Sequence, residues 1–287
     1  MVKDHMGKIS SRRDDSHKGD YGKVLVVAGS KGMAGAAYLC SMGALRSGSG
    51  LVTCAVPRPL SAVLETKFTE VMTLSVSADA GGTGFGVKSL GDILDFAGKC
   101  DSVAIGPGLG DKPGVLKLVP ELLNNIECPV VLDADGLNAM RGKVERIKKR
   151  KGPTVLTPHP GEAARLLEED TRSVQDDRVG AAKRLVESTG AVVCLKGHGT
   201  VVAGQNSDIF INDSGNSGMA TGGTGDVLTG IITSFIGQGL EPYGAAVSGV
   251  YLHGMAGDIA AQRKGPFSMI ASDVLDSLHE AFSKAGI

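Results

Sequence analysis

The chain has few of the residues that mark several common protein classes. It has no Trp, aromatic residues make up 4% of its 287 residues, and its formal net charge is −1. Such a composition offers neither a basic surface for phosphates nor aromatic platforms for bases, which excludes nucleic acid and acidic membranes as partners. No apolar run reaches the ~18 residues of a membrane span, and residues 1–15 contain no hydrophobic signal core. We therefore predict a cytoplasmic protein that binds no membrane.

Cysteine pairs are also absent from the sequence. The five cysteines are odd in number and none forms a CxxC motif: Cys40, Cys54, Cys100, Cys128 and Cys194. This count favours a reduced compartment over a disulfide framework or a zinc site. The chain also lacks a Pro- or Ser-rich linker and internal repeats. We expect one domain over residues 1–287, with residues 1–16 as a loosely ordered lead-in.

Short apolar runs alternate with stretches of helical periodicity along the chain. Runs that are apolar throughout predict strands buried on both faces, and therefore a mostly parallel sheet with helices on both faces. The expected strands are 23–28, 51–56, 102–105, 130–132, 154–156 and 191–195, with an antiparallel hairpin or edge from 200–203 and 209–211. The expected C-terminal helices are 227–236, 242–262 and 271–285, and the glycine-rich segment 80–86 is expected to be a solvent loop.

Glycine is abundant, and its most informative cluster is Gly222-Gly223-Thr224-Gly225-Asp226, which is followed directly by an apolar run of helical spacing. The first N–H groups of that helix would face whatever occupies the loop, so the segment predicts an anion site, most naturally for phosphate. A carboxylate there suits a base that takes a proton from a hydroxyl group during phosphoryl transfer. The alternative is that Asp226 only caps the helix.

Polar residues follow most of the predicted strands, and the carboxyl ends of parallel strands form the ligand-binding edge of an open sheet. His159 either contacts a ligand or bonds to its own loop, and Glu162 either binds a metal through water or occupies the first turn of a helix. Asp133 and Asp135 could reach magnesium or a substrate hydroxyl, although Asp135 could equally cap a helix that also presents Asn138. Lys196 could meet a phosphate or leave the core for solvent. His253 and His279 are interpreted as core or surface histidines.

Taken together, these motifs resemble one family. In order along the chain they are His17-Lys18-Gly19, Gly35-Ala36-Ala37, Gly106 to Gly110, Asp133 to Asn138, Thr157 to Glu162, Lys196 to Thr200 and Ser214 to Asp226. The chain resembles the ADP/ATP-dependent NAD(P)H-hydrate dehydratases of the ribokinase-like superfamily, from about His17 to the C-terminus. The epimerase domain fused to some family members has no counterpart in the short lead-in.

The resemblance implies a role for each motif. Asp226 would be the catalytic base, with Gly222, Gly223, Thr224 and Gly225 forming the anion hole. Ala36, Gly108, His159 and Asp226 would bind the hydrated nicotinamide. Lys196, Gly197, His198, Gly199, Thr200 and Gly225 would bind the adenine nucleotide, and Mg²⁺ would shield its phosphates, with no ligand assigned beyond a weak candidate in Glu162.

The implied function is repair of hydrated NADH or NADPH, the S-epimer, by nucleotide-dependent dehydration with ADP as the favoured donor and ATP as the other. The resemblance further implies a homotetramer that works with a separate epimerase. A small-molecule kinase of the same fold, acting on a vitamin precursor, is the first alternative. A non-catalytic nucleotide sensor is the second.

Overall fold

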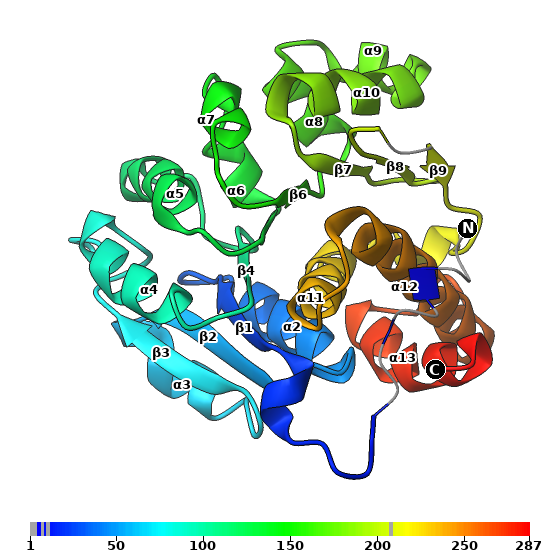
Figure 1. The fold of residues 1–287 in the computed structure, drawn as a ribbon, viewed down its shortest axis with the longest axis horizontal. Helices are drawn as coiled ribbons and strands as arrows, with labels where there is room; N and C mark the ends of the chain where they lie inside the picture. The colour runs from blue at the N-terminus through cyan, green and yellow to red at the C-terminus, as the bar shows by residue number, and fades with distance from the viewer. Residues whose placement is uncertain (1–4, 7–8, 10–11, 207–208) are drawn as a thin grey trace.

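The computed structural model describes residues 5–6, 9, 12–206 and 209–287. Its centre is a nine-stranded sheet, parallel from the first strand in spatial order to the seventh and antiparallel at the last two (Figure 1). In spatial order the strands are β3 (Met72–Val76), β2 (Leu51–Pro57), β1 (Lys23–Val27), β4 (Ser102–Ile105), β5 (Val130–Leu132), β6 (Thr154–Leu156), β7 (Val192–Leu195), β8 (Val201–Ala203) and β9 (Phe210–Ile211).

Helices cover both faces of the sheet, and each face has its own apolar core. Alternation along β1 assigns Val24 and Val26 to one core and Leu25 and Val27 to the other. The first core takes side chains from α2 (Ala34–Arg46), α3 (Ser61–Glu65), α11 (Thr224–Gly237), α12 (Pro242–Lys264) and α13 (Ala271–Ala285). The second takes them from α4 (Leu90–Ala97), α5 (Pro113–Asn125), α6 (Asp135–Asn138), α7 (Val144–Lys148), α8 (Pro160–Leu167), α9 (Thr171–Asp176) and α10 (Arg178–Thr189).

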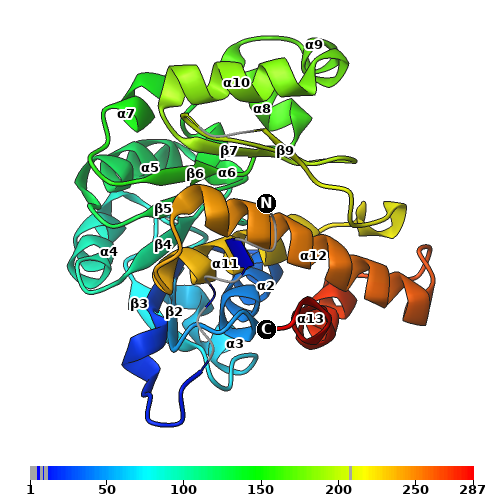
Figure 2. The ribbon, with the colours of Figure 1, turned by 45° about the vertical axis from the view of Figure 1, so that its right-hand side comes forward.

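Short 3₁₀ turns complete the described secondary structure: η1 (Lys18–Tyr21), η2 (Arg58–Leu60), η3 (Val87–Ser89) and η4 (Ser217–Met219). In both ribbon views α11 lies beside α2 and α12 (Figures 1 and 2). The packing of α11 on α2 is so close that a Cβ added to Gly230 would lie 2.1 Å from the carbonyl oxygen of Cys40. This contact fixes where the N-terminus of α11 points.

The predicted fold class is confirmed, and so are most of the predicted elements. Strands 102–105, 130–132 and 154–156 and helix 271–285 have the expected bounds, and β8 pairs antiparallel with β7 and β9. Strand β3 was not predicted, because an edge strand that is largely open to solvent lacks a continuous apolar run. No helix in the described ranges is long and apolar enough to cross a membrane.

The segment 80–86 is not the simple solvent loop that was expected. Its first residues are exposed, but Phe85 is fully buried in the second core and pairs with Ala78 through an isolated β-bridge. Much of the expected lead-in, 1–4, 7–8 and 10–11, lies outside the described residues. Within it, Met6 is buried and His5 lies edge-on to the ring of Tyr243 in α12.

Candidate active site

A cavity of about 760 Å³ lies where β6 and β7 end, beside the N-terminus of α11. Its walls come from segments far apart in the sequence, as the strand-end rule predicts. The lining residues are His159, Pro160, Lys196 to Thr200, Asn212, Ser214 to Ser217, Met219 to Gly222, Thr224, Gly225, Leu228, Val250, His253 and Gly254. The cavity therefore brings together all six predicted nucleotide-binding residues and the predicted anion hole except Gly223.

The glycine loop turns sharply into α11. Gly223 is the N-cap residue at φ +95°, a left-handed conformation that favours glycine, and a Cβ there would lie 2.4 Å from Leu39 Cδ1. The Thr224 hydroxyl donates to the carbonyls of Met219 and Thr221, at 2.9 and 3.1 Å, which holds the loop closed. Within the described chain, the N–H groups of Thr224, Gly225 and Asp226 donate to no other residue, as expected in the first turn of a helix. They remain available to an anion.

Asp226 is the third residue of α11, so it is not the N-cap that the alternative interpretation required. Its side chain accepts no hydrogen bond from any other described residue. Burial and the charge of Asp133 raise the pKa of Asp226 to about 7, and Lys196 opposes both effects. A carboxylate that titrates near neutral pH is suited to act as a general base.

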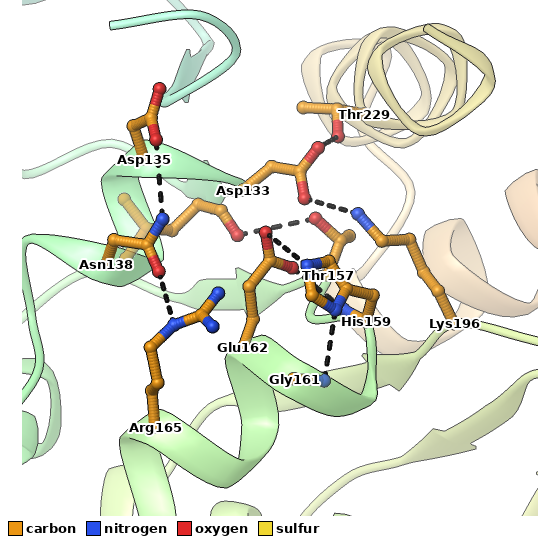
Figure 3. Close-up of polar contacts among 11 residues, drawn as sticks. Asp133, Asp135, Asn138, Thr157, His159, Gly161, Glu162, Arg165, Lys196 and Thr229 are labelled. Carbon is orange, nitrogen blue, oxygen red and sulfur yellow. Dashed lines mark hydrogen bonds and ion pairs between the residues drawn. The ribbon is translucent and has the colours of Figure 1, made fainter. Parts of the chain in front are cut away.

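Lys196 and Asp133 form the most buried ion pair of the site (Figure 3). The Lys196 ammonium donates to Asp133 Oδ1 at 2.6 Å, and the Thr229 hydroxyl of α11 donates to Oδ2 at 2.7 Å. Asp133 is fully buried, so its carboxylate is held by these two donors and does not face solvent. Burial lowers the pKa of Lys196, but the carboxylates of Asp133 and Glu162 outweigh it and raise the pKa overall. A Cβ on Gly225 would lie 3.2 Å from the ammonium, so a fixed positive charge adjoins the anion hole.

His159 and Glu162 are hydrogen-bonded to each other at the start of α8. The Gly161 N–H donates to His159 Nδ1 at 3.0 Å, and the His159 N–H donates to the Glu162 carboxylate at 2.8 Å. Both local alternatives from the sequence are therefore present, and His159 also lines the cavity. Burial raises the pKa of Glu162 to about 7 and lowers that of His159. Lys196 affects both groups, which places them close to it.

Ala36 and Gly108 lie on the other side of the site and do not line the cavity. A Cβ on Gly108 would approach the Ala36 Cβ to 2.9 Å, so the loop after β4 rests on the start of α2. Asp135 anchors that loop, because its carboxylate accepts the Gly110 N–H at 2.7 Å. Ala134, not Asp135, is the N-cap residue of α6. Asp226 itself does not line the cavity either, whereas its neighbour Gly225 does.

Sequence reasoning missed several residues of the site. Thr229 and Val250 have no sequence feature that separates them from other residues inside a helix. The packing of α11 places Thr229 against Asp133, and the packing of α12 places Val250 in the cavity wall. His253 is buried, as expected of a core histidine, but it also lines the cavity, and burial lowers its pKa to about 4. Asp258 of α12 anchors the loop before η4, because its carboxylate accepts the Gly215 N–H at 2.9 Å and the Asn216 amide at 3.0 Å.

The described residues do not include three His, Cys, Asp or Glu side chains grouped closely enough to hold a metal ion by themselves. This agrees with the chemistry of Mg²⁺ at nucleotide sites, where one or two carboxylates act together with substrate phosphates and water. The Glu162 carboxylate, near Lys196 and the cavity, fits that smaller contribution.

Comparison with known proteins identifies the family. The sequence model of the NAD(P)H-hydrate dehydratase family matches residues 24–280. The bifunctional NAD(P)H-hydrate repair enzyme Nnr of Moorella thermoacetica is 46% identical over 94% of this chain and 51% of its own length, and the ADP-dependent (S)-NAD(P)H-hydrate dehydratase of Neisseria meningitidis serogroup B is 38% identical over 90% and 83%. The chain thus spans about half the length of the bifunctional relatives it matches.

A solved structure agrees with the sequence relatives. The ADP/ATP-dependent NAD(P)H-hydrate dehydratase of Bacillus subtilis, co-crystallized with ATP/Mg²⁺, superposes with a TM-score of 0.83 at 30% identity, covering 99% of this chain and 97% of that one. This likeness confirms the predicted ribokinase-like fold. The chain belongs to the NAD(P)H-hydrate dehydratase family.

Proposed function

We propose that this chain dehydrates the S-epimer of hydrated NADH or NADPH at the expense of an adenine nucleotide, with ADP as the favoured donor. One observation carries the proposal: Asp226, with a pKa of about 7, stands beside N–H groups that donate to no other described residue and beside the Lys196 ammonium. A base, an anion hole and a fixed positive charge are what phosphoryl transfer to a hydroxyl group requires.

In the proposed reaction, Asp226 takes the proton from the ring hydroxyl as the hydroxyl oxygen bonds to the terminal phosphorus of the nucleotide. The bond from that phosphorus to the bridging oxygen breaks, which releases AMP from ADP or ADP from ATP. The N–H groups of Thr224 and Gly225 stabilise the charge on the phosphoryl oxygens, and Lys196 adds a positive charge on the same side. The phosphate then leaves with the electrons of the carbon–oxygen bond, and loss of a proton from the neighbouring ring carbon restores the double bond. Phosphate is a far better leaving group than hydroxide.

The substrate-side and nucleotide-side assignments rest on the family resemblance. We propose that Lys196, Gly197, His198, Gly199, Thr200 and Gly225 bind the nucleotide and that Ala36, Gly108, His159 and Asp226 bind the hydrated nicotinamide. Glu162 would contribute to holding Mg²⁺ on the nucleotide phosphates, where the metal shields their charge. A single catalytic domain, a cytoplasmic homotetramer and a separate epimerase complete the proposal.

The test mixes the protein with hydrated NADH, Mg²⁺ and either ADP or ATP, and follows the absorbance of the reduced nicotinamide. We expect a rise that depends on the nucleotide and is faster with ADP. Asp226→Asn should lower the rate by at least about 10³-fold while ADP affinity stays within a few-fold, since only the base is lost. The control is Asp276→Asn, which changes an exposed carboxylate on α13 and should have no effect.

The same assay separates the alternatives. A phosphorylated product that accumulates without any rise in absorbance would support the small-molecule kinase instead. Tight ADP binding without turnover of any alcohol, and without any effect of Asp226→Asn, would support the nucleotide sensor.

A further inference from the structure

Arg178, the first residue of α10, lies directly behind the predicted nucleotide loop Lys196–Thr200. Its Nη2 donates to the carbonyl oxygens of Leu195 at 2.9 Å, Lys196 at 3.3 Å and Gly199 at 3.4 Å. Its Nη1 donates to the Gln175 side chain at 3.1 Å. One guanidinium therefore donates hydrogen bonds to three carbonyls at the two ends of the loop that joins β7 to β8.

The Arg178 guanidinium is half-buried, and burial lowers its pKa. Across the described ranges no carboxylate lies within ion-pair distance of it, and the neighbouring Asp177 is bound to the Gly180 N–H and to Arg184. The first turn of a helix also disfavours a positive charge. Among the described residues, the hydrogen-bond partners of this cation are therefore the three carbonyls and the Gln175 side chain.

These contacts involve the carbonyl groups of the loop and not its N–H groups. Two more of its carbonyls are occupied, since Gly197 O accepts from the Thr200 hydroxyl at 3.0 Å and Thr200 O accepts from the Asn212 N–H at 2.9 Å. By contrast, the N–H groups of Gly197, His198 and Gly199 donate to no other residue in the described part of the chain. Consecutive free N–H groups in a turn form an anion-binding concavity.

Close packing keeps the two sides of the loop apart. Gly197 has φ +138°, and a Cβ on it would lie 2.8 Å from Arg178 Nη1, so only glycine lets the guanidinium approach the loop backbone. Gly197, His198 and Gly199 all line the cavity, which Arg178 does not. The carbonyls of Lys196 and Gly199 are thus bound by the arginine, while the residues that carry the free N–H groups line the cavity.

We propose that Arg178 is a positioning residue for nucleotide binding: it holds the carbonyls of the Lys196–Thr200 loop so that the loop N–H groups bind the phosphates of the adenine nucleotide. The inference rests on the proposed nucleotide site, and it does not depend on which reaction follows binding. Arg178 touches no substrate in this arrangement and acts only through the loop.

The experiment measures ADP and adenosine binding by calorimetry, in the presence of Mg²⁺, for wild type, Arg178→Met, Arg178→Lys and the control Arg184→Met. Arg184 is a cation on the same helix that pairs with Glu169 and Asp177 and does not contact the loop. We expect Arg178→Met to weaken ADP binding roughly 10- to 100-fold, as expected for loss of charge-assisted hydrogen bonds, and to change adenosine binding less than 2-fold. Arg184→Met should leave both affinities within 2-fold.

Arg178→Lys tests whether geometry or charge matters. Lysine keeps the positive charge but lacks the planar fork that spans several carbonyls, so we expect an intermediate loss of ADP affinity, about 3- to 10-fold. If Arg178→Met unfolds at a lower temperature than Arg184→Met, the ADP affinity of Arg178→Lys decides whether the arginine positions the loop. In turnover assays, the KM for ADP should rise while kcat and the KM for hydrated NADH stay within 2-fold.

Three results would overturn the inference. They are ADP binding by Arg178→Lys equal to wild type, an equal loss of adenosine and ADP affinity in Arg178→Met, and absence of ADP binding by the wild-type protein. Wild-type protein that binds ADP but does not dehydrate hydrated NADH would count against the proposed function alone, because the binding measurements would still decide the role of Arg178.

Discussion

Lys196→Met should destabilise the protein far more than loss of an ordinary lysine, because it leaves a buried charge behind. Asp133 is fully buried and has two donors, the Lys196 ammonium at 2.6 Å and the Thr229 hydroxyl at 2.7 Å. Removing one partner of such a pair costs about 3–5 kcal/mol in the free energy of unfolding. For a chain of 287 residues, that corresponds to a drop of about 5–8 °C in Tm.

The double variant Asp133→Asn/Lys196→Met should recover most of this loss, since an asparagine can still accept from Thr229 and carries no charge. The control is Lys112→Met, which breaks a pair at 3.0 Å between an exposed lysine and Asp79. Asp79 keeps the N–H groups of Thr83 and Gly84 as donors, so this change should cost about 1 kcal/mol or less. Urea unfolding at neutral pH measures all three variants. The reasoning is refuted if Lys196→Met costs no more than Lys112→Met, or if the double variant is no more stable than Lys196→Met.

Three further outcomes are expected from the structure. Because Asp226 has a pKa of about 7 and works as a base only when ionised, kcat/KM should fall tenfold per pH unit below about 7; a flat profile down to pH 5 would contradict this role. His159→Ala should raise the KM for hydrated NADH more than the KM for ADP in steady-state kinetics, whereas the reverse would place His159 with the nucleotide. Gly230→Ala should cost about 3 kcal/mol or more in the free energy of unfolding by urea, because its Cβ would lie 2.1 Å from Cys40 O. Gly91→Ala in α4, where an added Cβ meets nothing within 4 Å, should be neutral or stabilising. Equal effects of the two substitutions would mean that α2 and α11 can separate freely.

The sequence predicted the central sheet well because its inner strands are buried on both faces. Such strands need apolar residues at every position, and the runs 102–105, 130–132 and 154–156 show this directly. Strand β3 has no such run, because much of it faces solvent at the sheet edge. Phe85 was hidden for the opposite reason: a single aromatic residue in a glycine-rich segment gives no periodic signal of burial.

The parts of the candidate site that depend on local backbone conformation could be predicted from residue type. Gly223 at positive φ and the acid at the start of α11 are local features, so the loop and its acid could be found from one short segment. The family resemblance extended that segment to the loops after the other strands. It could not say that Asp135 anchors Gly110, nor that His159 is bonded to its own turn.

What the sequence alone determined is therefore the set of strand-end loops, their glycines and the single acid at the start of α11, because these depend on residues next to one another in the chain. The tertiary structure decided which charges meet. Asp133 pairs with Lys196, 63 positions away, and Thr229 joins them from 96 positions away. Arg178 reaches the nucleotide loop only because α10 packs behind β7. A side chain's partner at such separations is set by how helices pack on the sheet, and residue type and local spacing carry no record of that packing.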